Sequence, residues 1–147
     1  MSIPQVVIDT NLFVAAGFKP DSASGRLLEA VRSGRVRMRW NEATRRETER
    51  VVRKIPPLSW ERCAGLFRDE DRCDLETHPD AFAFVPDPDD RKFAALAEAC
   101  GIPLVTSDEH LLGVQHRLGV PVLTPGEWST EHAPRATADA PPPPLDD

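Results

Sequence analysis

Residues 5–11 read QVVIDTN, and the interpretation of the fold starts from this stretch. Residues 5–8 form a short, mainly apolar run that is rich in β-branched side chains and ends at Asp9. Such a run is typical of a strand that is buried on both faces of a parallel sheet. The acid and the polar residues Thr10 and Asn11 therefore follow the carboxyl end of a predicted buried strand.

Helices and strands alternate along the rest of the chain. Apolar periodicity and capping residues predict helices over residues 22–33, 41–55, 87–100 and 109–118, with one or two short helices within 58–75. Further strands are expected over residues 35–40, 81–85, 102–106 and 120–123. Asn41 and Asp87 are expected to be N-caps, as is Ser22 or Ser24. This alternation indicates an α/β fold with a mainly parallel sheet.

Length and composition predict one globular, soluble domain followed by a tail. The chain has 147 residues, of which 40% are apolar and 29% are charged. Its longest apolar run is too short to cross a membrane, and its N-terminus shows no secretory signal. Three cysteines are an odd number, so we expect no disulfide framework and a cytoplasmic location. We expect the domain to span residues 1–128 and a proline-rich, disordered tail to span residues 129–147.

The net charge of −6 is unevenly distributed along the chain. Residues 22–72 carry a net charge of +5, whereas residues 73–147 carry −10. A basic half beside an acidic half suggests a polyanionic partner combined with a cluster of carboxylates. The alternative is that solvated helix faces differ in sign without any function.

Four acids stand out because their positions bring them toward the predicted core. Asp9 and Asp108 directly follow two predicted strands, and parallel strands place their carboxyl ends at one edge of the sheet. Glu47 lies in an i, i+4 apolar stripe of the 41–55 helix, where an unpaired carboxylate is costly. Asp90 precedes apolar residues at spacings that place it on the core-facing side of the 87–100 helix.

Each acid also has a structural interpretation. Asp9 can bond nearby backbone N–H groups, and Asp108 can cap the helix that follows it. Asp90 can complete a capping box with Asp87, while Glu47 can form a buried salt bridge or lie on another helix face. Taken together, however, clustered carboxylates repel one another and raise each other's pKa values. A hard divalent cation relieves this repulsion, and oxygen ligands favour Mg²⁺ or Mn²⁺.

Other kinds of site have weaker support in the sequence. The cysteines and His78 lack zinc-finger spacing, and neither a Walker A loop nor a Rossmann glycine fingerprint is present. The four histidines have no obvious nucleophile beside them, so we interpret each as a surface or helix residue. An aspartyl-nucleophile phosphatase would need a second aspartate two residues after Asp9, where Asn11 stands.

Five segments in order resemble the PIN-domain ribonuclease family, and in particular the toxin components of bacterial toxin–antitoxin pairs (VapC-like). Residues 6–14 resemble the opening strand with its first acid, and residues 41–47 resemble the helix with the second acid, with Asn41 in place of the common serine. Residues 87–97 and 104–108 are similar to the third and fourth acidic segments. Residues 120–128 are similar to the closing strand and turn. The resemblance covers residues 4–128.

The resemblance implies a three-layer α/β/α PIN-like nuclease domain with a five-stranded, mainly parallel sheet in the order 3-2-1-4-5. It also implies a metal-dependent endoribonuclease that hydrolyses RNA phosphodiester bonds with Mg²⁺ or Mn²⁺. The acids expected to bind metal and act in catalysis are Asp9, Glu47, Asp90 and Asp108. The residues expected to support these ligands or to contact phosphate are Thr10, Asn11, Thr106 and Ser107.

The basic segment 35–54 gains a role as a phosphate-facing surface if the chain binds RNA. Arg46 and Arg50 flank Glu47 and are the expected RNA contacts. A cognate antitoxin protein and a second copy of the chain are the other expected partners, and a membrane is not. The alternative is an inactive PIN scaffold that binds RNA or a protein without cutting, and the presence of all four acids favours the nuclease.

Overall fold

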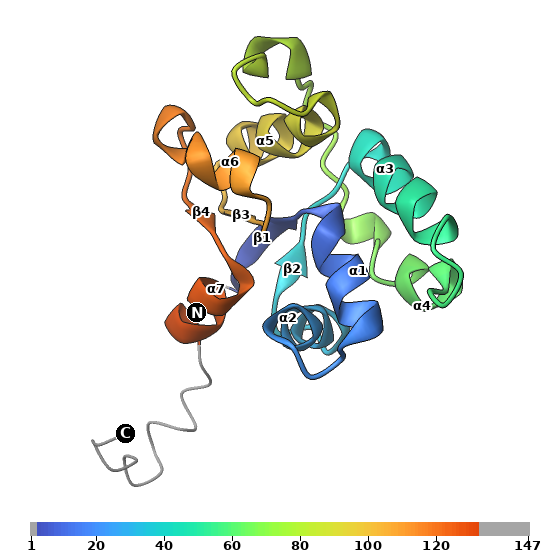
Figure 1. Cartoon of the computed structure of the whole chain (residues 1–147). Coiled ribbons are helices and arrows are strands. Elements are labelled where there is room, and N and C mark those ends of the chain that lie inside the picture. The colour runs from blue at the N-terminus through green and yellow to red at the C-terminus, as the bar shows by residue number, and fades with distance from the viewer. Residues whose placement is uncertain (1–2, 133–147) are drawn as a thin grey trace, which may run out of the picture.

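Four parallel strands form the sheet of the computed structural model, which describes residues 3–132 (Figure 1). The strands are β1 (Gln5–Ile8), β2 (Arg37–Met38), β3 (Leu104–Val105) and β4 (Val122–Leu123), in the spatial order β2-β1-β3-β4. The central strand β1 pairs with β2 at Val6↔Met38 and with β3 at Ile8↔Val105. The predicted buried strand and the parallel α/β architecture are therefore confirmed.

Helices cover both faces of this sheet (Figure 1). The α-helices are α1 (Thr10–Phe18), α2 (Ala23–Arg32), α3 (Glu42–Arg53), α4 (Trp60–Ala64), α5 (Pro88–Cys100), α6 (Glu109–Gly113) and α7 (Pro125–Glu131). Short 3₁₀ turns are η1 (Asp69–Asp71), η2 (Pro79–Phe82) and η3 (Gln115–Arg117). Val6 and Ile8 pack into a core with α1, α2 and α7, whereas Val7 packs into a second core with α5 and α6. The strand's two-residue period thus divides the apolar residues between two layers.

The expected five-stranded sheet and the strand over residues 81–85 are wrong for the described residues. That segment forms η2 and a turn in which the N–H of Val85 donates to the carbonyl of Phe82. Phe82 and Val85 are its buried residues, so the apolar spacing is three, which suits a 3₁₀ turn better than a strand. The edge beside β2 carries one parallel bridge between Trp40 and Arg72 instead of a full strand.

Two helices lie where the sequence analysis placed none. The helix α1 begins directly after Asp9, whose side chain makes no capping hydrogen bond, so the usual start signal is missing. The helix α7 begins with a capping box between Thr124 and Glu127 and runs beyond the expected domain boundary at residue 128. Residues 133–147 of the expected tail lie outside the described residues.

Three predicted N-caps are confirmed. Ser22 accepts a hydrogen bond from the N–H of Gly25 at 3.1 Å, and Asn41 accepts one from Thr44 at 3.0 Å. Asp87 begins α5 by accepting from the N–H of Asp89. These local signals orient α3 and α5, the two helices that carry predicted acids.

A close backbone contact at the start of α2 generates the first prediction. A Cβ atom on Gly25 would collide with the carbonyl oxygen of Pro20, whereas a Cβ on Gly65 meets nothing within 4 Å. Gly25→Ala should therefore destabilise the fold by about 1–3 kcal/mol, although alanine is normally favoured in helices. Gly65→Ala, at a helical φ of −69°, should be neutral or stabilise the fold by about 0.4–1 kcal/mol. Urea denaturation measures the free energy of unfolding of both variants. Equal changes in the two variants would contradict a close contact at Gly25.

Candidate active site

A cavity of about 180 Å³ at the carboxyl end of the sheet brings together all four predicted acids. Its walls come from the ends of β1 and β3 and from the helices α1, α3 and α5. The lining residues are Asp9, Thr10, Asn11, Glu47, Arg50, Val51, Asp87, Asp89, Asp90, Phe93 and Asp108. Residues almost 100 positions apart in the sequence thus share one small acidic space.

Asp9 lies in the base of this site with only 2% of its surface exposed. The Oγ1 hydroxyl of Thr106 donates to Oδ2 of Asp9 at 2.7 Å, and the same hydroxyl accepts from the N–H of Asp108 at 2.9 Å. Burial raises the pKa of Asp9 to about 6, against the lowering effect of the Thr106 hydrogen bond. The negative charges of Asp108 and Glu47 raise this pKa further.

Asp90 is buried in the first turn of α5, with 7% of its surface exposed. The expected capping box is not observed, because Asp87 alone caps the helix with its side chain. Burial raises the pKa of Asp90 to about 8, and the charges of Asp9 and Asp108 add to this shift. Its Oδ2 atom is buried and has no hydrogen-bond partner among the described residues. A buried carboxylate oxygen of this kind requires a partner that the described side chains do not supply.

Glu47 lies at the wall of the cavity, where two basic side chains offset its negative charge. Arg50 Nη2 lies 2.7 Å from one carboxylate oxygen and 2.9 Å from the other, and Lys92 Nζ lies 3.3 Å away. The predicted apolar stripe has the wrong phase, because α3 buries Thr44, Thr48 and Val52 instead. Glu47 is one position from that stripe, and its side chain is nevertheless only 10% exposed. Both structural alternatives, the salt bridge and the shifted helix face, therefore hold for this residue.

Asp108 has two roles in the structure. Its Oδ1 caps α6 by accepting from the N–H of His110 at 2.7 Å, and its side chain also lines the cavity. One ligand atom from each of Asp90, Asp108 and His110 lies within 4.8 Å of the others, a spacing that a metal ion could bridge. The side chain of His110 is exposed, which agrees with its interpretation as a surface residue. Its position two residues after Asp108 is the signal that could have included it in the candidate site.

The structure places only part of the predicted supporting set beside the acids. Thr106 contacts Asp9 directly, and Asn11 lines the cavity. Thr10 also lines the cavity, but its hydroxyl lies 3.0 Å from that of Thr48 and therefore joins α1 to α3. Ser107 is exposed and is not among the lining residues.

The two predicted RNA-contacting arginines have different surroundings. Arg50 lines the cavity, where it binds Glu47 and lies 3.5 Å from Asp89. Arg46 is 75% exposed and lies 3.5 Å from Glu42, one turn earlier on the same helix. Arg50 is thus part of the site, whereas Arg46 lies on the surface beside it.

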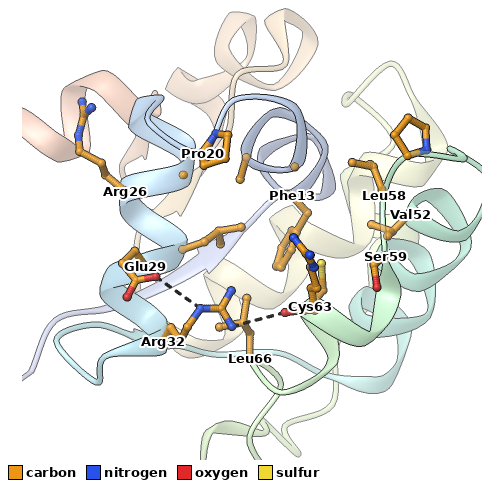
Figure 2. A pocket seen from close by; sticks show the side chains of 16 residues that line it. Phe13, Pro20, Arg26, Glu29, Arg32, Val52, Leu58, Ser59, Cys63 and Leu66 are labelled. Atoms are coloured by element: carbon orange, nitrogen blue, oxygen red, sulfur yellow. Dashed lines mark hydrogen bonds and ion pairs between the residues drawn. The ribbon is translucent and has the colours of Figure 1, made fainter.

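A larger cavity of about 520 Å³ lies between α1, α2, α3 and α4 (Figure 2). Apolar side chains such as Phe13 and Leu66 line it, and Arg32 lies at its edge, 3.5 Å from Glu29. None of the four predicted acids contributes to its walls. The cavity lacks a carboxylate cluster, so the candidate chemistry belongs to the smaller acidic cavity.

The fold and the acidic cavity together define an α/β protein with a carboxylate cluster at the carboxyl end of a parallel sheet. A family model described as PIN domain matches residues 5–110, and the chain belongs to this family. PIN domains are typically metal-dependent nucleases. No curated protein and no solved structure matches the chain. No helix within residues 3–132 combines the length and apolar character needed to cross a membrane.

The donor atoms of the cavity fit a hard divalent cation. Asp9, Asp90 and Asp108 offer oxygen ligands, and the Oδ2 atom of Asp90 has no hydrogen-bond partner within residues 3–132. Carboxylate oxygens suit Mg²⁺ and Mn²⁺ better than softer metals. A cation bound here would offset the mutual repulsion of the carboxylates and satisfy the unpaired oxygen.

The raised pKa values of Asp9 and Asp90 predict an unusual pH dependence of stability. Both groups hold protons in the folded protein at pH values where the unfolded chain, with an ordinary value of 3.8, has released them. In EDTA, the free energy of unfolding should therefore fall as the pH rises from about 4 to about 8. Asp90→Asn should flatten this fall and stabilise the protein at pH 8.

Urea denaturation between pH 4 and pH 8 measures this effect. Asp74→Asn is the matched control, because it makes the same charge change at an exposed side chain. A slope that Asp90→Asn leaves unchanged would show that this carboxyl group is not desolvated.

Proposed function

We propose that this protein is a metal-dependent endoribonuclease that hydrolyses RNA phosphodiester bonds. The observation that carries the proposal is the convergence of Asp9, Glu47, Asp90 and Asp108 on one cavity. Stability alone does not account for this arrangement, because the arrangement brings carboxylates together and leaves an oxygen of Asp90 without a hydrogen-bond partner in the described part of the chain. Membership of the PIN domain family supports the same chemistry.

Each residue of the site has a distinct role in this proposal. Asp9, Asp90 and Asp108 would hold one or two Mg²⁺ or Mn²⁺ ions, and Thr106 orients Asp9 through its hydroxyl. A bound cation supplies polarisation of the scissile phosphate and lowers the pKa of a water molecule. Glu47 would accept a proton from the attacking water, and its ion pairs with basic side chains fix its carboxylate at the cavity wall.

We further propose that the nuclease is the toxin of a bacterial toxin–antitoxin pair. The sequence resemblance over residues 4–128 supports this assignment and implies a cognate antitoxin as a protein partner. A second copy of the chain is the other partner that we propose. Induced expression should then arrest growth, and co-expression of a small reading frame upstream of the gene should restore it. Growth arrest that persists in Asp9→Asn would contradict toxicity through RNA cleavage.

Cleavage of a mixed RNA substrate tests the nuclease, with Mn²⁺ or EDTA present. Mn²⁺ should support cleavage and EDTA should stop it. Asp9→Asn and Asp90→Asn should reduce cleavage by at least about 100-fold, because a neutral amide removes a charge from the cation site. Asp87→Asn is the matched control three residues from Asp90. It keeps an N-cap acceptor, so it should cost at most about 1 kcal/mol of stability and retain most activity.

Melting temperatures separate the nuclease from the inactive scaffold. Mn²⁺ should raise the melting temperature of the wild-type chain, because the cation binds only the folded cluster, and Asp9→Asn should lose most of this rise. A rise without any cleavage would favour the scaffold that binds without cutting. Equal rises in the wild type and in Asp9→Asn would contradict a cation site at these acids.

The basic side chains of α3 generate a prediction about RNA binding. In the non-cleaving Asp9→Asn background, replacing Arg46 and Arg50 with alanine should weaken RNA binding. The log–log salt dependence should flatten by about 0.7–0.9 for each lost phosphate contact. Filter binding between 50 and 200 mM salt measures the slope, and Arg62→Ala at the other cavity is the control. An unchanged slope would assign both arginines to the solvated surface.

A further inference from the structure

Two cysteines that lie far apart in the sequence have their sulfur atoms in contact. The Sγ atoms of Cys73 and Cys100 are 3.1 Å apart, although the residues are separated by 27 positions. A disulfide bond needs a sulfur–sulfur distance of about 2.05 Å, so each side chain would move by only about half an ångström. Closing this gap needs a small adjustment of the side chains and no rearrangement of the fold.

The backbone holds each of these cysteines in place. The N–H of Cys73 donates to the carbonyl of Trp40 at 2.7 Å, which ties this segment to the edge of the sheet beside β2. Cys100 is the last residue of α5, and Gly101 ends that helix in a left-handed conformation with a φ of 66°. Both cysteines pack in the core between the sheet and α5, so their contact is a product of the tertiary fold.

The surroundings of the pair indicate an oxidisable dithiol and not a metal-binding site. Within the described residues no third histidine, cysteine or acid completes a metal-binding group with these two sulfurs. Burial and the contact with Cys73 raise the pKa of the Cys100 thiol to about 12, so this thiol does not offer the thiolate that a metal ligand needs at neutral pH. Cys100 is half-buried and open to a reagent, whereas Cys73 is only 2% exposed.

We propose that Cys73 and Cys100 form a reversible disulfide with small-molecule disulfides, of which oxidised glutathione is an example, as the oxidant. The Cys100 thiol loses its proton, and its sulfur attacks one sulfur of the oxidant, which releases the first thiol. Cys73 then loses its proton and attacks the Cys100 sulfur, which releases the second thiol. Two protein thiols become one disulfide, and one oxidant disulfide becomes two thiols that carry the two protons.

This cross-link encloses the turn η2 and nearly all of α5. The closed loop restricts the unfolded chain, so the oxidised form should be the more stable one. Asp90 lies ten residues before Cys100, or about 15 Å along the helix axis. The disulfide therefore forms away from the acidic cavity, and the proposal does not depend on the nuclease activity.

The test uses the full-length chain at pH 8.5, incubated with oxidised and reduced glutathione over a range of ratios. Maleimide labelling after acid quenching should count three free thiols in the reduced protein and one in the oxidised protein. Trypsin separates the cysteines into peptides 63–68, 73–91 and 93–117. Mass spectrometry should find peptides 73–91 and 93–117 joined, two hydrogens lighter than their sum.

Matched variants define the outcome. Cys63→Ser removes the cysteine of the other core and should keep the link and the rise in melting temperature on oxidation, roughly 5–10 °C. Cys100→Ser should lose both, and Cys100→Ala serves if the serine variant does not fold. Three persisting free thiols, a glutathione adduct on Cys100 alone, or a link through Cys63 would each overturn the proposal.

Discussion

The buried hydroxyl of Thr106 is the constraint on which the acidic cavity depends. It donates to Asp9 and accepts from the backbone of Asp108, so one side chain joins the residues that follow β1 and β3. The pairing of Ile8 with Val105 places those residues side by side. A threonine suits this position because its β-branched side chain fits a strand end while its hydroxyl satisfies two polar groups. The register of β1 and β3 therefore determines where Asp9 and Asp108 lie relative to each other.

Basic side chains on the surrounding helices offset part of the repulsion between the clustered carboxylates. Arg50 and Lys92 offset the charge of Glu47 at the wall, but Asp9 and Asp90 have raised pKa values deeper in the cavity. Among the described residues, Asp9 and Asp90 thus have no basic partner, whereas the buried Asp71 is paired with Arg37 at 2.6 Å. A core selected for stability alone would pair or replace such groups. Their persistence is what a site that binds a cation requires.

The sequence predicted what local signals determine and missed what packing determines. The buried strand and the N-caps Asn41 and Asp87 were predictable because each depends on a few neighbouring residues. The buried face of α3 was not predictable from the sequence. Thr44 and Thr48 resemble surface residues until the hydrogen bonds of their hydroxyl groups are known. The strand expected over residues 81–85 was wrong for a related reason: all five residues are apolar, so the sequence does not show that only Phe82 and Val85, three positions apart, are buried.

Contacts between side chains of different elements cannot be predicted from local sequence patterns. Lys92 reaches Glu47 from a different helix, 45 positions away, and the two sulfurs meet only because α5 spans the distance between the cavity and the sheet edge. The helix α5 carries Asp90 in its first turn and Cys100 at its last residue. Its packing against β1, β3 and α3 therefore fixes both the acid cluster and the dithiol. A displacement of this one helix would separate Asp90 from Asp9 and the two sulfurs from each other, which makes α5 the element that couples the site to the core.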